Sequence, residues 1–230
     1  MKWIYKLDYK FGRYHIRNLM RYIVGGMVVV YVLQLLLSPI NLTGAGGWLS
    51  LWRDGILSGQ VWRLVTFIFI PEGGNVFLMF ISLYVYYLIG NSLENIWGGF
   101  RLNLYYLIGI LGSIASVFVS PLGYTTNTAL NLSLFLAFAT LAPNTEFLFF
   151  FVIPLKAKWL AIGYVGFMAI DLIRAFALAG AGYGLSMLIA YGFSLVNYLL
   201  FFGPTLISGM KEQLRIAKNR RNWRANNRNR

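Results

Sequence analysis

Long stretches without a charged residue mark the predicted membrane spans of this chain. The first uncharged run extends from Ile23 to Leu42, and a second lies between Glu72 and Glu94, with its apolar part over Val76–Ser92. A charge at the centre of a bilayer costs several kcal/mol, so such runs are typical of helices that cross a membrane. Each run is long enough for one crossing of about 20 residues.

The longest uncharged run, between Arg101 and Glu146, is too long for a single crossing. A turn-forming segment, 121–127, begins with proline and contains a glycine and an asparagine. Proline and glycine interrupt regular helices, so this segment predicts a division into two spans. We therefore expect one helix over Leu102–Ser120 and another over Thr128–Ala142.

Two more apolar segments complete the predicted bundle. Trp159–Leu178 is one span, and Gly184–Phe202 is another that Gly203-Pro204 is expected to end. Phe147–Ile153 is apolar but too short to cross, and a proline follows it, so we expect an interfacial or re-entrant segment. The pattern predicts an all-α fold, a polytopic bundle of six transmembrane helices.

The overall composition agrees with a membrane protein. Of 230 residues, 58% are hydrophobic and 12% are charged, and the mean hydropathy is +0.63. Soluble domains carry about 25% charged residues, and the aromatic content of 17% argues against disorder. The absence of cysteine excludes disulfides, thiolate metal sites and cysteine nucleophiles. Neither a metal site nor a cofactor is predicted.

The distribution of basic residues predicts the topology. Of 20 Lys and Arg, six lie before the first span and eight after Pro204, whereas the predicted outer loops contain only Arg53 and Arg63. The positive-inside rule then places both termini in the cytoplasm, and we expect residence in the plasma membrane. The predicted units are a basic cytoplasmic arm (1–22), a membrane domain (23–203) and a basic cytoplasmic tail (204–230).

The basic tail is expected to contact the lipid surface and to be disordered at its end. Basic residues attract anionic lipids by about 1 kcal/mol each near the surface. Nucleic-acid binding is disfavoured because the tail offers a single tryptophan for stacking. The predicted lipid contacts are Lys211, Arg215, Lys218, Arg220, Arg221 and Arg224.

Two short motifs flank the predicted second span. In the turn after it, Gly90 would permit close helix approach, Glu94 would accept backbone N–H groups, Gly98 would supply unusual backbone angles, and Arg101 would neutralise Glu94. The alternative is a solvated loop with unrelated charges. Before the span, the pair Trp62-Arg63 is interpreted either as a structural motif or as an interfacial tryptophan beside a snorkelling arginine.

Together these motifs resemble the rhomboid family of membrane proteins over roughly residues 20–203. The likeness comprises Trp62-Arg63 with the following Thr66-Phe67, the Gly90-x3-Glu94-x3-Gly98-x2-Arg101 turn, Ala142-Pro143-Asn144, and the apolar segment that leads into 154–159. Derlins share part of this pattern and are a neighbouring possibility. The resemblance implies a rhomboid-like core of six spans.

The resemblance fails at the catalytic residues. Active rhomboids use a serine at the start of the fourth span and a histidine in the sixth, but the corresponding stretch here is Asn127-Thr128-Ala129 and the sixth span contains no histidine. His15, the one histidine, is expected on the cytoplasmic side. No catalytic residue is therefore assigned. The candidates for lining a vestigial cavity, or for hydrogen bonds between helices, are Asn127, Thr128, Asn131 and Ser133.

Asp171 and Arg174 are the charged residues inside the predicted fifth span. Their i, i+3 spacing predicts a self-neutralising pair near the outer interface, with either a structural or a functional role.

Three functions remain open at this point. The favoured one, implied by the resemblance, is a proteolytically inactive rhomboid-like protein that binds transmembrane segments of client membrane proteins. A second is an intramembrane serine endopeptidase that uses Ser133 or Thr128. A third is a small transporter or channel whose polar path contains Asn127, Asn131, Asp171 and Arg174.

Overall fold

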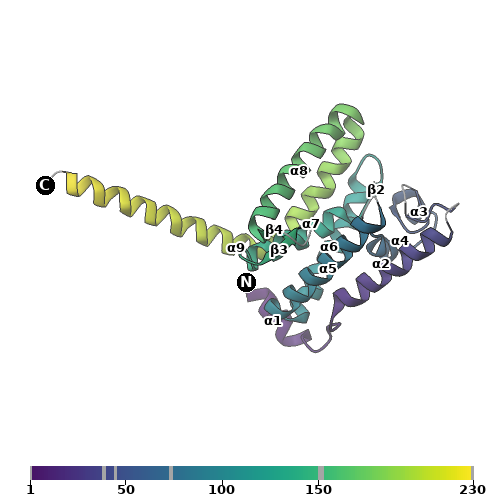
Figure 1. Ribbon diagram of the computed structural model, residues 1–230, viewed down its shortest axis with the longest axis horizontal. Coiled ribbons are helices and arrows are strands. Elements are labelled where there is room, and N and C mark those ends of the chain that lie inside the picture. Colours follow the sequence, from purple (N-terminus) through teal and green to yellow (C-terminus); the bar gives the residue numbers. More distant parts are fainter. Residues whose placement is uncertain (1, 38–39, 44–45, 73–74, 150–152, 229–230) are drawn as a thin grey trace.

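The computed structural model describes residues 2–37, 40–43, 46–72, 75–149 and 153–228. Helices dominate it, and two short antiparallel sheets, β1–β2 and β3–β4, join them (Figure 1). In chain order the elements are α1 (Lys2–Phe11), α2 (Leu19–Leu36), β1 (Leu51–Trp52), α3 (Arg53–Leu57), α4 (Arg63–Thr66), the 3-10 helix η1 (Phe67–Phe69), α5 (Val76–Trp97), α6 (Gly99–Val119), β2 (Tyr124–Thr125), α7 (Thr128–Leu141), β3 (Glu146–Phe149), β4 (Ile153–Lys156), α8 (Ala157–Leu178) and α9 (Ala181–Arg228).

Within the described residues, five helices are long and apolar enough to cross a membrane: α2, α5, α6, α8 and the part of α9 from Ala181 to Pro204. The predicted polytopic all-α bundle is thereby confirmed. The remaining predicted span, the fourth in chain order, is the helix α7, which has only 14 residues. At 1.5 Å per residue it is about 21 Å long, shorter than a hydrocarbon core of about 30 Å. A six-span topology therefore stays a prediction.

The short helix α7 lies at the centre of the bundle. It packs on α5, α6, α8 and α9, and all residues from Ala129 to Leu134 are buried. Helices α8 and the first part of α9 form a hairpin, and α2 packs on the far side of α5 (Figure 1). Among the described residues, α5 and α8 both contact α7 extensively but not each other. We call the side of α7 that lies between these two helices, where they do not pack extensively on each other, the opening between α5 and α8.

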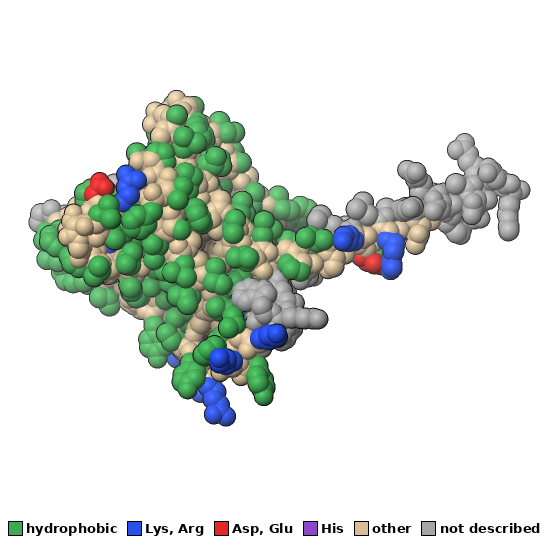
Figure 2. Space-filling view, turned by 180° about the vertical axis from the view of Figure 1, so that it is seen from behind, with side chains coloured by type: hydrophobic (Ala, Val, Ile, Leu, Met, Phe, Trp, Pro, Cys, Tyr) green, Lys and Arg blue, Asp and Glu red, His purple; other side chains and the backbone are tan. Residues whose placement is uncertain are grey.

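The outer surface of the bundle is apolar. Figure 2 shows hydrophobic side chains over most of the body, with Lys and Arg side chains gathered at one end and along the projecting helix. Exposed residues on α5 and α8 include Phe77, Phe80, Ile162 and Ile173. A surface of this kind is stable only when lipid or another apolar partner covers it.

The first loop is folded and is organised by Arg63. This side chain is only 4% exposed, and it donates from Nε to Gln60 Oε1 (2.7 Å) and from one terminal nitrogen to the carbonyls of Ser50 (2.9 Å) and Gly47. Burial lowers the pKa of Arg63 below its ordinary value. A Cβ at position 55 would lie 2.7 Å from Arg63 Nε. The neighbouring helix α3 can therefore approach the Arg63 side chain this closely only because residue 55 is a glycine. Arg63 is therefore a buried crosslink and does not snorkel.

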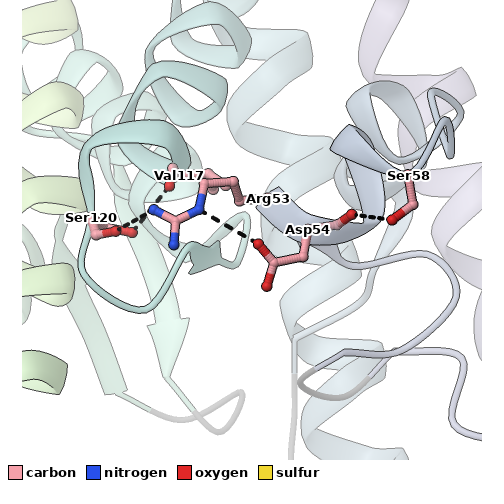
Figure 3. Close-up of polar contacts among 5 residues, drawn as sticks. All are labelled: Arg53, Asp54, Ser58, Val117 and Ser120. Carbon is pink, nitrogen blue, oxygen red and sulfur yellow. Dashed lines mark hydrogen bonds and ion pairs between the residues drawn. The ribbon is translucent and has the colours of Figure 1, made fainter.

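The other arginine of this loop, Arg53, lies at the carboxyl end of α6 (Figure 3). Its guanidinium donates to the Ser120 carbonyl (3.4 Å) and lies 3.7 Å from the carboxylate of Asp54, while its backbone N–H donates to Gly123 (2.7 Å). A cation at this position interacts favourably with the helix dipole and with the free terminal carbonyls. Both arginines of the predicted outer loop therefore have structural roles.

In the turn between α5 and α6, the two glycines and Glu94 have the predicted roles, whereas Arg101 has a partner that was not predicted. A Cβ at Gly90 would collide with Met20 of α2, and Gly98 has a φ of +87°, so both glycines are required. Glu94 Oε1 accepts the backbone N–H of Asn18 (2.8 Å), which precedes α2. Arg101 Nε lies 3.2 Å from Asp8 Oδ2 of α1, a partner that the sequence analysis did not predict.

Phe147–Ile153 is mostly part of an antiparallel hairpin, in which Glu146 pairs with Lys156 and Phe149 with Ile153; residues 150–152 lie outside the described chain. Its interfacial or re-entrant position stays a prediction. The apolar span of α9 ends at Pro204, as predicted. The helix itself does not end there, because α9 continues through Pro204 to Arg228. A proline removes one helical hydrogen bond, and strong helix formers such as Lys, Gln, Leu and Arg follow it.

The prediction that the tail is disordered at its end is also wrong as far as Arg228, where α9 ends. The tail projects away from the bundle (Figure 1). An i, i+3 pair joins Glu212 to Arg215 at 2.7 Å. Among the predicted lipid contacts, Lys211, Arg215 and Arg220 are exposed, whereas the side chains of Lys218, Arg221 and Arg224 are outside the described ones.

Candidate functional site

The first of the cavity candidates, Asn127, fastens the first loop to α7. Its side chain is 1% exposed and donates from Nδ2 to the backbone carbonyl of Ile70 (2.7 Å). Its own carbonyl accepts from Asn131 N–H as α7 begins. Asn127 therefore determines how the chain after η1 enters the bundle.

Thr128 pairs locally. Its hydroxyl lies 2.9 Å from the Thr126 hydroxyl, and its backbone N–H points to the same oxygen. Next to it, Ser194 of α9 donates to the carbonyl of Ala129. At the start of α7, the helix α9 thus contributes the Ser194 hydroxyl, and the hydrogen bond of this hydroxyl joins the two helices.

Ser133 belongs to a buried cluster on the face of α7 that contacts α6 and α9. We call Tyr105, Ser133 and Asn197 the closed cluster. Ser133 Oγ donates to the Leu130 carbonyl (2.8 Å), the Tyr105 hydroxyl donates to the Ser133 carbonyl (2.7 Å), and Asn197 Nδ2 donates to Ser133 Oγ (3.4 Å) and to the Tyr105 carbonyl (3.3 Å). All three side chains are at most 2% exposed.

Among the described residues, no base forms a hydrogen bond with the Ser133 hydroxyl of the closed cluster. The side chain of α9 that reaches Ser133 is an asparagine amide, which donates a hydrogen bond and does not take up a proton. A serine hydroxyl needs a base within hydrogen-bond reach to become a nucleophile. His15 lies against Gly99 at the start of α6, about 30 Å along that helix from the end where α7 begins.

A second polar cluster, which the sequence analysis missed, lies on the α5 side of α7. We call Glu72, Tyr86 and Asn131 the open cluster. The Glu72 carboxylate accepts from the Tyr86 hydroxyl at Oε2 (2.6 Å) and from Asn131 Nδ2 at Oε1 (3.2 Å). Ser82 Oγ donates to the Glu72 carbonyl (2.7 Å) and so holds the backbone against α5. Glu72 remains half-buried.

A small cavity lies next to the open cluster. Tyr86, Asn131 and Tyr106 of α6 contribute its polar groups, and its other lining residues are apolar. Tyr106 is 3% exposed and its hydroxyl has no hydrogen-bond partner among the described residues. A buried hydroxyl without a partner costs about 1–3 kcal/mol, which makes it a candidate for a contact with a bound group.

Among the described residues, no basic side chain forms an ion pair with Glu72. The ion pairs found in the described part of the chain join Arg53 to Asp54, Asp8 to Arg101, and Glu212 to Arg215, and none includes Glu72. Its hydrogen-bond donors are neutral. No group of three potential metal ligands occurs among the residues that the structure describes. The arrangement can accept a proton or a cationic hydrogen-bond donor.

Sequence reasoning used Glu72 only to mark the end of an uncharged run. The available signal was a carboxylate at the entrance of a span with no basic residue near it in sequence. Its insertion between α5 and α7 depends on the folded loop, because Asn127 and Ser82 hold the backbone on both sides of it.

The charged residues of α8 do not form the predicted pair. Asp171 is half-buried, Arg174 is exposed, and no ion pair joins these two described residues. Asp171 is close enough to Tyr191 of α9 to affect it electrostatically. One residue therefore faces the neighbouring helix while the other extends outward, and i, i+3 spacing alone does not join them.

Comparison with known families places the chain. It belongs to the family described as Eukaryotic integral membrane protein (DUF1751), whose model matches residues 21–205. No curated protein and no solved structure matches it. The matched region extends from α2 to the membrane part of α9, so it contains both clusters and leaves out α1 and most of the basic tail.

Proposed function

We propose that this integral membrane protein is a rhomboid-like pseudoprotease that binds transmembrane segments of client membrane proteins without cleaving them. The observation that carries the proposal is the opening between α5 and α8. Both helices pack on α7, and neither packs extensively on the other in the described chain. Glu72, which is hydrogen-bonded to α5 and α7, and Tyr164 of α8 are both half-buried. A client helix in the bilayer would enter sideways from the lipid.

The absence of cleavage in this proposal rests on the closed cluster. Ser133 is 0% exposed and is used three ways: as a donor to Leu130, as an acceptor from Asn197, and through its carbonyl by Tyr105. A peptide bond has no approach to its hydroxyl, and no base faces it. Thr128, the other candidate nucleophile, pairs with a second threonine.

The short central helix supports the sideways entry of clients. Because α7 extends about 21 Å, its ends lie within the thickness of an average hydrocarbon core of about 30 Å. Although α7 itself is enclosed by other helices, we propose that the bundle built around this short element thins the bilayer locally, at a modest cost per ångström of mismatch. Local thinning lowers the barrier for a client helix that carries a polar residue into the same region.

In this proposal the rhomboid-like core has six spans, and both termini face the cytoplasm. The basic tail then lies at the inner leaflet, with Lys211, Arg215 and Arg220 available to anionic lipids. The predicted plasma-membrane residence stays a prediction, because a eukaryotic family is equally compatible with internal membranes.

Site-specific photo-crosslinking in native membranes tests client binding. A photoreactive amino acid would replace Tyr164, at the opening, and in a matched control Val29, which is exposed on α2. We expect adducts with integral membrane proteins from position 164 and lipid adducts alone from position 29. Equal protein adducts at both positions, or none at either, would contradict the proposal.

Reaction with a serine-directed fluorophosphonate tests the protease alternative. We expect the same background labelling of the wild-type protein and of Ser133→Ala, since the Ser133 hydroxyl is buried and lacks a base. Labelling of the wild type that Ser133→Ala abolishes would show an active serine and would refute the pseudoprotease assignment.

A further inference from the structure

The open cluster has an unsatisfied charge inside the bundle. An ionised carboxylate has about four acceptor sites, and the described hydrogen bonds to Glu72 occupy two of them, from Tyr86 and Asn131. Both donors are neutral, and the described chain supplies no cation to this carboxylate. Glu72 therefore retains acceptor capacity for a positively charged donor.

The carboxylate lies within the depth of the membrane. Tyr86 is ten residues beyond the start of α5 at Val76, which corresponds to about 15 Å along the helix axis. Side chains on a helix point back toward its N-terminus, so the Tyr86 hydroxyl lies nearer the first loop than its Cα does. An unpaired charge at such a depth is costly, and intramembrane acids usually face a bundle interior and find a partner there.

The surroundings of the carboxylate suit a long basic side chain. Both α5 and α8 carry exposed apolar residues, such as Phe80 and Ile162, which suit contact with the body of a helix. A lysine ammonium has three donors on a flexible stem, and an arginine guanidinium has five.

From this charge complementarity we infer that Glu72 selects client transmembrane segments that carry a lysine or arginine in the half of the membrane nearer the first loop. The inference rests on the proposed function and adds the class of client to it. On entry, the basic side chain forms an ion pair with Glu72, while Tyr86 and Asn131 keep the carboxylate oriented through their existing hydrogen bonds. Each charge removes the cost of leaving the other unpaired in the bilayer.

Binding of designed peptides to the full-length protein in lipid nanodiscs tests this inference. The probes are transmembrane peptides of Leu and Ala, of about 20 residues, with Lys, Leu or Glu at one position that is moved along the peptide. We expect wild-type protein to prefer Lys over Leu by about tenfold when that position lies in the half nearer the first loop. The Glu peptide should bind more weakly than the Leu peptide.

Two substitutions separate the charge of Glu72 from general effects. Glu72→Gln keeps the size of the side chain, so the Leu peptide should bind as to wild type while the preference for Lys disappears. Asp54→Asn removes a charge from the first loop on an exposed residue, and it should keep the full preference. Unchanged binding of the Leu peptide also shows that the Glu72→Gln variant is folded.

Each outcome decides one of the two claims. Binding of all peptides with no preference for Lys, or a preference that Glu72→Gln retains, overturns the inference and leaves client binding standing. Failure of every peptide to bind wild-type protein overturns the proposed function and this inference together.

Discussion

Two polar clusters lie on opposite faces of the same short helix, and they differ in charge and in exposure. Neither is fully satisfied within the described chain, because Asn197 Oδ1 of the closed cluster has no hydrogen-bond partner there. Asn131 and Ser133 are two residues apart on α7, about 200° around the helix. The closed cluster around Ser133 is neutral, at most 2% exposed and built from three helices. The open cluster around Asn131 contains a carboxylate, is half-buried at Glu72 and lacks a basic partner among the described residues.

The difference separates two uses of polar groups in a membrane bundle. Neutral groups that satisfy one another join helices and contribute stability. A carboxylate without a cation contributes little to stability, and its retention is better explained by a group that arrives from outside. On α7, the closed cluster holds α6, α7 and α9 together, whereas the open cluster faces the side where α5 and α8 do not meet.

The largest effect is expected from overpacking behind the closed cluster. A Cβ at Gly109 would collide with Leu130 and lie 3.0 Å from Asn197 Nδ2, whereas a Cβ at Gly112, one turn further along α6, would meet only ordinary contacts from 3.7 Å. We expect Gly109→Ala to lower the free energy of unfolding by about 1–3 kcal/mol and Gly112→Ala to leave it unchanged. Thermal unfolding in detergent measures both, and equal melting temperatures would contradict the packing described here.

Deleting polar groups one at a time compares the two clusters directly. Tyr105→Phe removes a buried hydrogen bond to Ser133, and we expect a loss of about 1 kcal/mol. Glu72→Gln should leave the melting temperature unchanged or raise it, because it removes an uncompensated charge and keeps the side chain's size. A larger loss of stability in Glu72→Gln than in Tyr105→Phe would reverse the assignment of the two clusters.

A smaller effect is expected where the open cluster is held in place indirectly. Asn127→Ala removes the hydrogen bond to Ile70 that fastens the loop before Glu72. We expect the preference for Lys peptides to fall severalfold, while the Leu peptide binds as before. Thr128→Ala, which disturbs only the pair with Thr126, is the matched control and should retain the preference.

The last prediction concerns topology. Labelling of single cysteines reports which side of the membrane each region faces, and we expect these substitutions to change neither stability nor binding. The chain has no cysteine, so single cysteines can be placed in the first loop (Leu57→Cys) and in the tail (Asn219→Cys), both at exposed positions. With six crossings we expect a membrane-impermeant maleimide to label the two from opposite sides. Labelling from the same side would mean that α7 does not complete a crossing.

Much of the helical framework was predictable because membrane insertion depends on local chain properties. The uncharged runs located α5, α6, α7 and α8 to within a few residues at most ends, and Gly90 and Gly98 have the expected roles. The first membrane helix, α2, begins at Leu19, before the uncharged run, because Arg21 is exposed near its start and causes no burial cost.

The partners of the charged residues were not predictable in the same way. Arg101 joins Asp8, which lies more than ninety positions earlier in the chain. Asp171 and Arg174 are neighbours in sequence and remain unpaired with each other. The continuation of α9 beyond Pro204 was also not predicted. Proline often ends a helix, but here the loss of one helical hydrogen bond was not enough to end it.

By itself, the sequence determined that this is a polytopic helical membrane protein and where its apolar helices lie. Those properties follow from the transfer free energy of each segment, which depends on the residues of that segment alone. Only the tertiary structure decided that Ser133 is enclosed and that Glu72 reaches into the bundle beside α7. Hydrogen-bond partners and access to a side chain depend on which helices meet, and segments far apart in the chain determine that together.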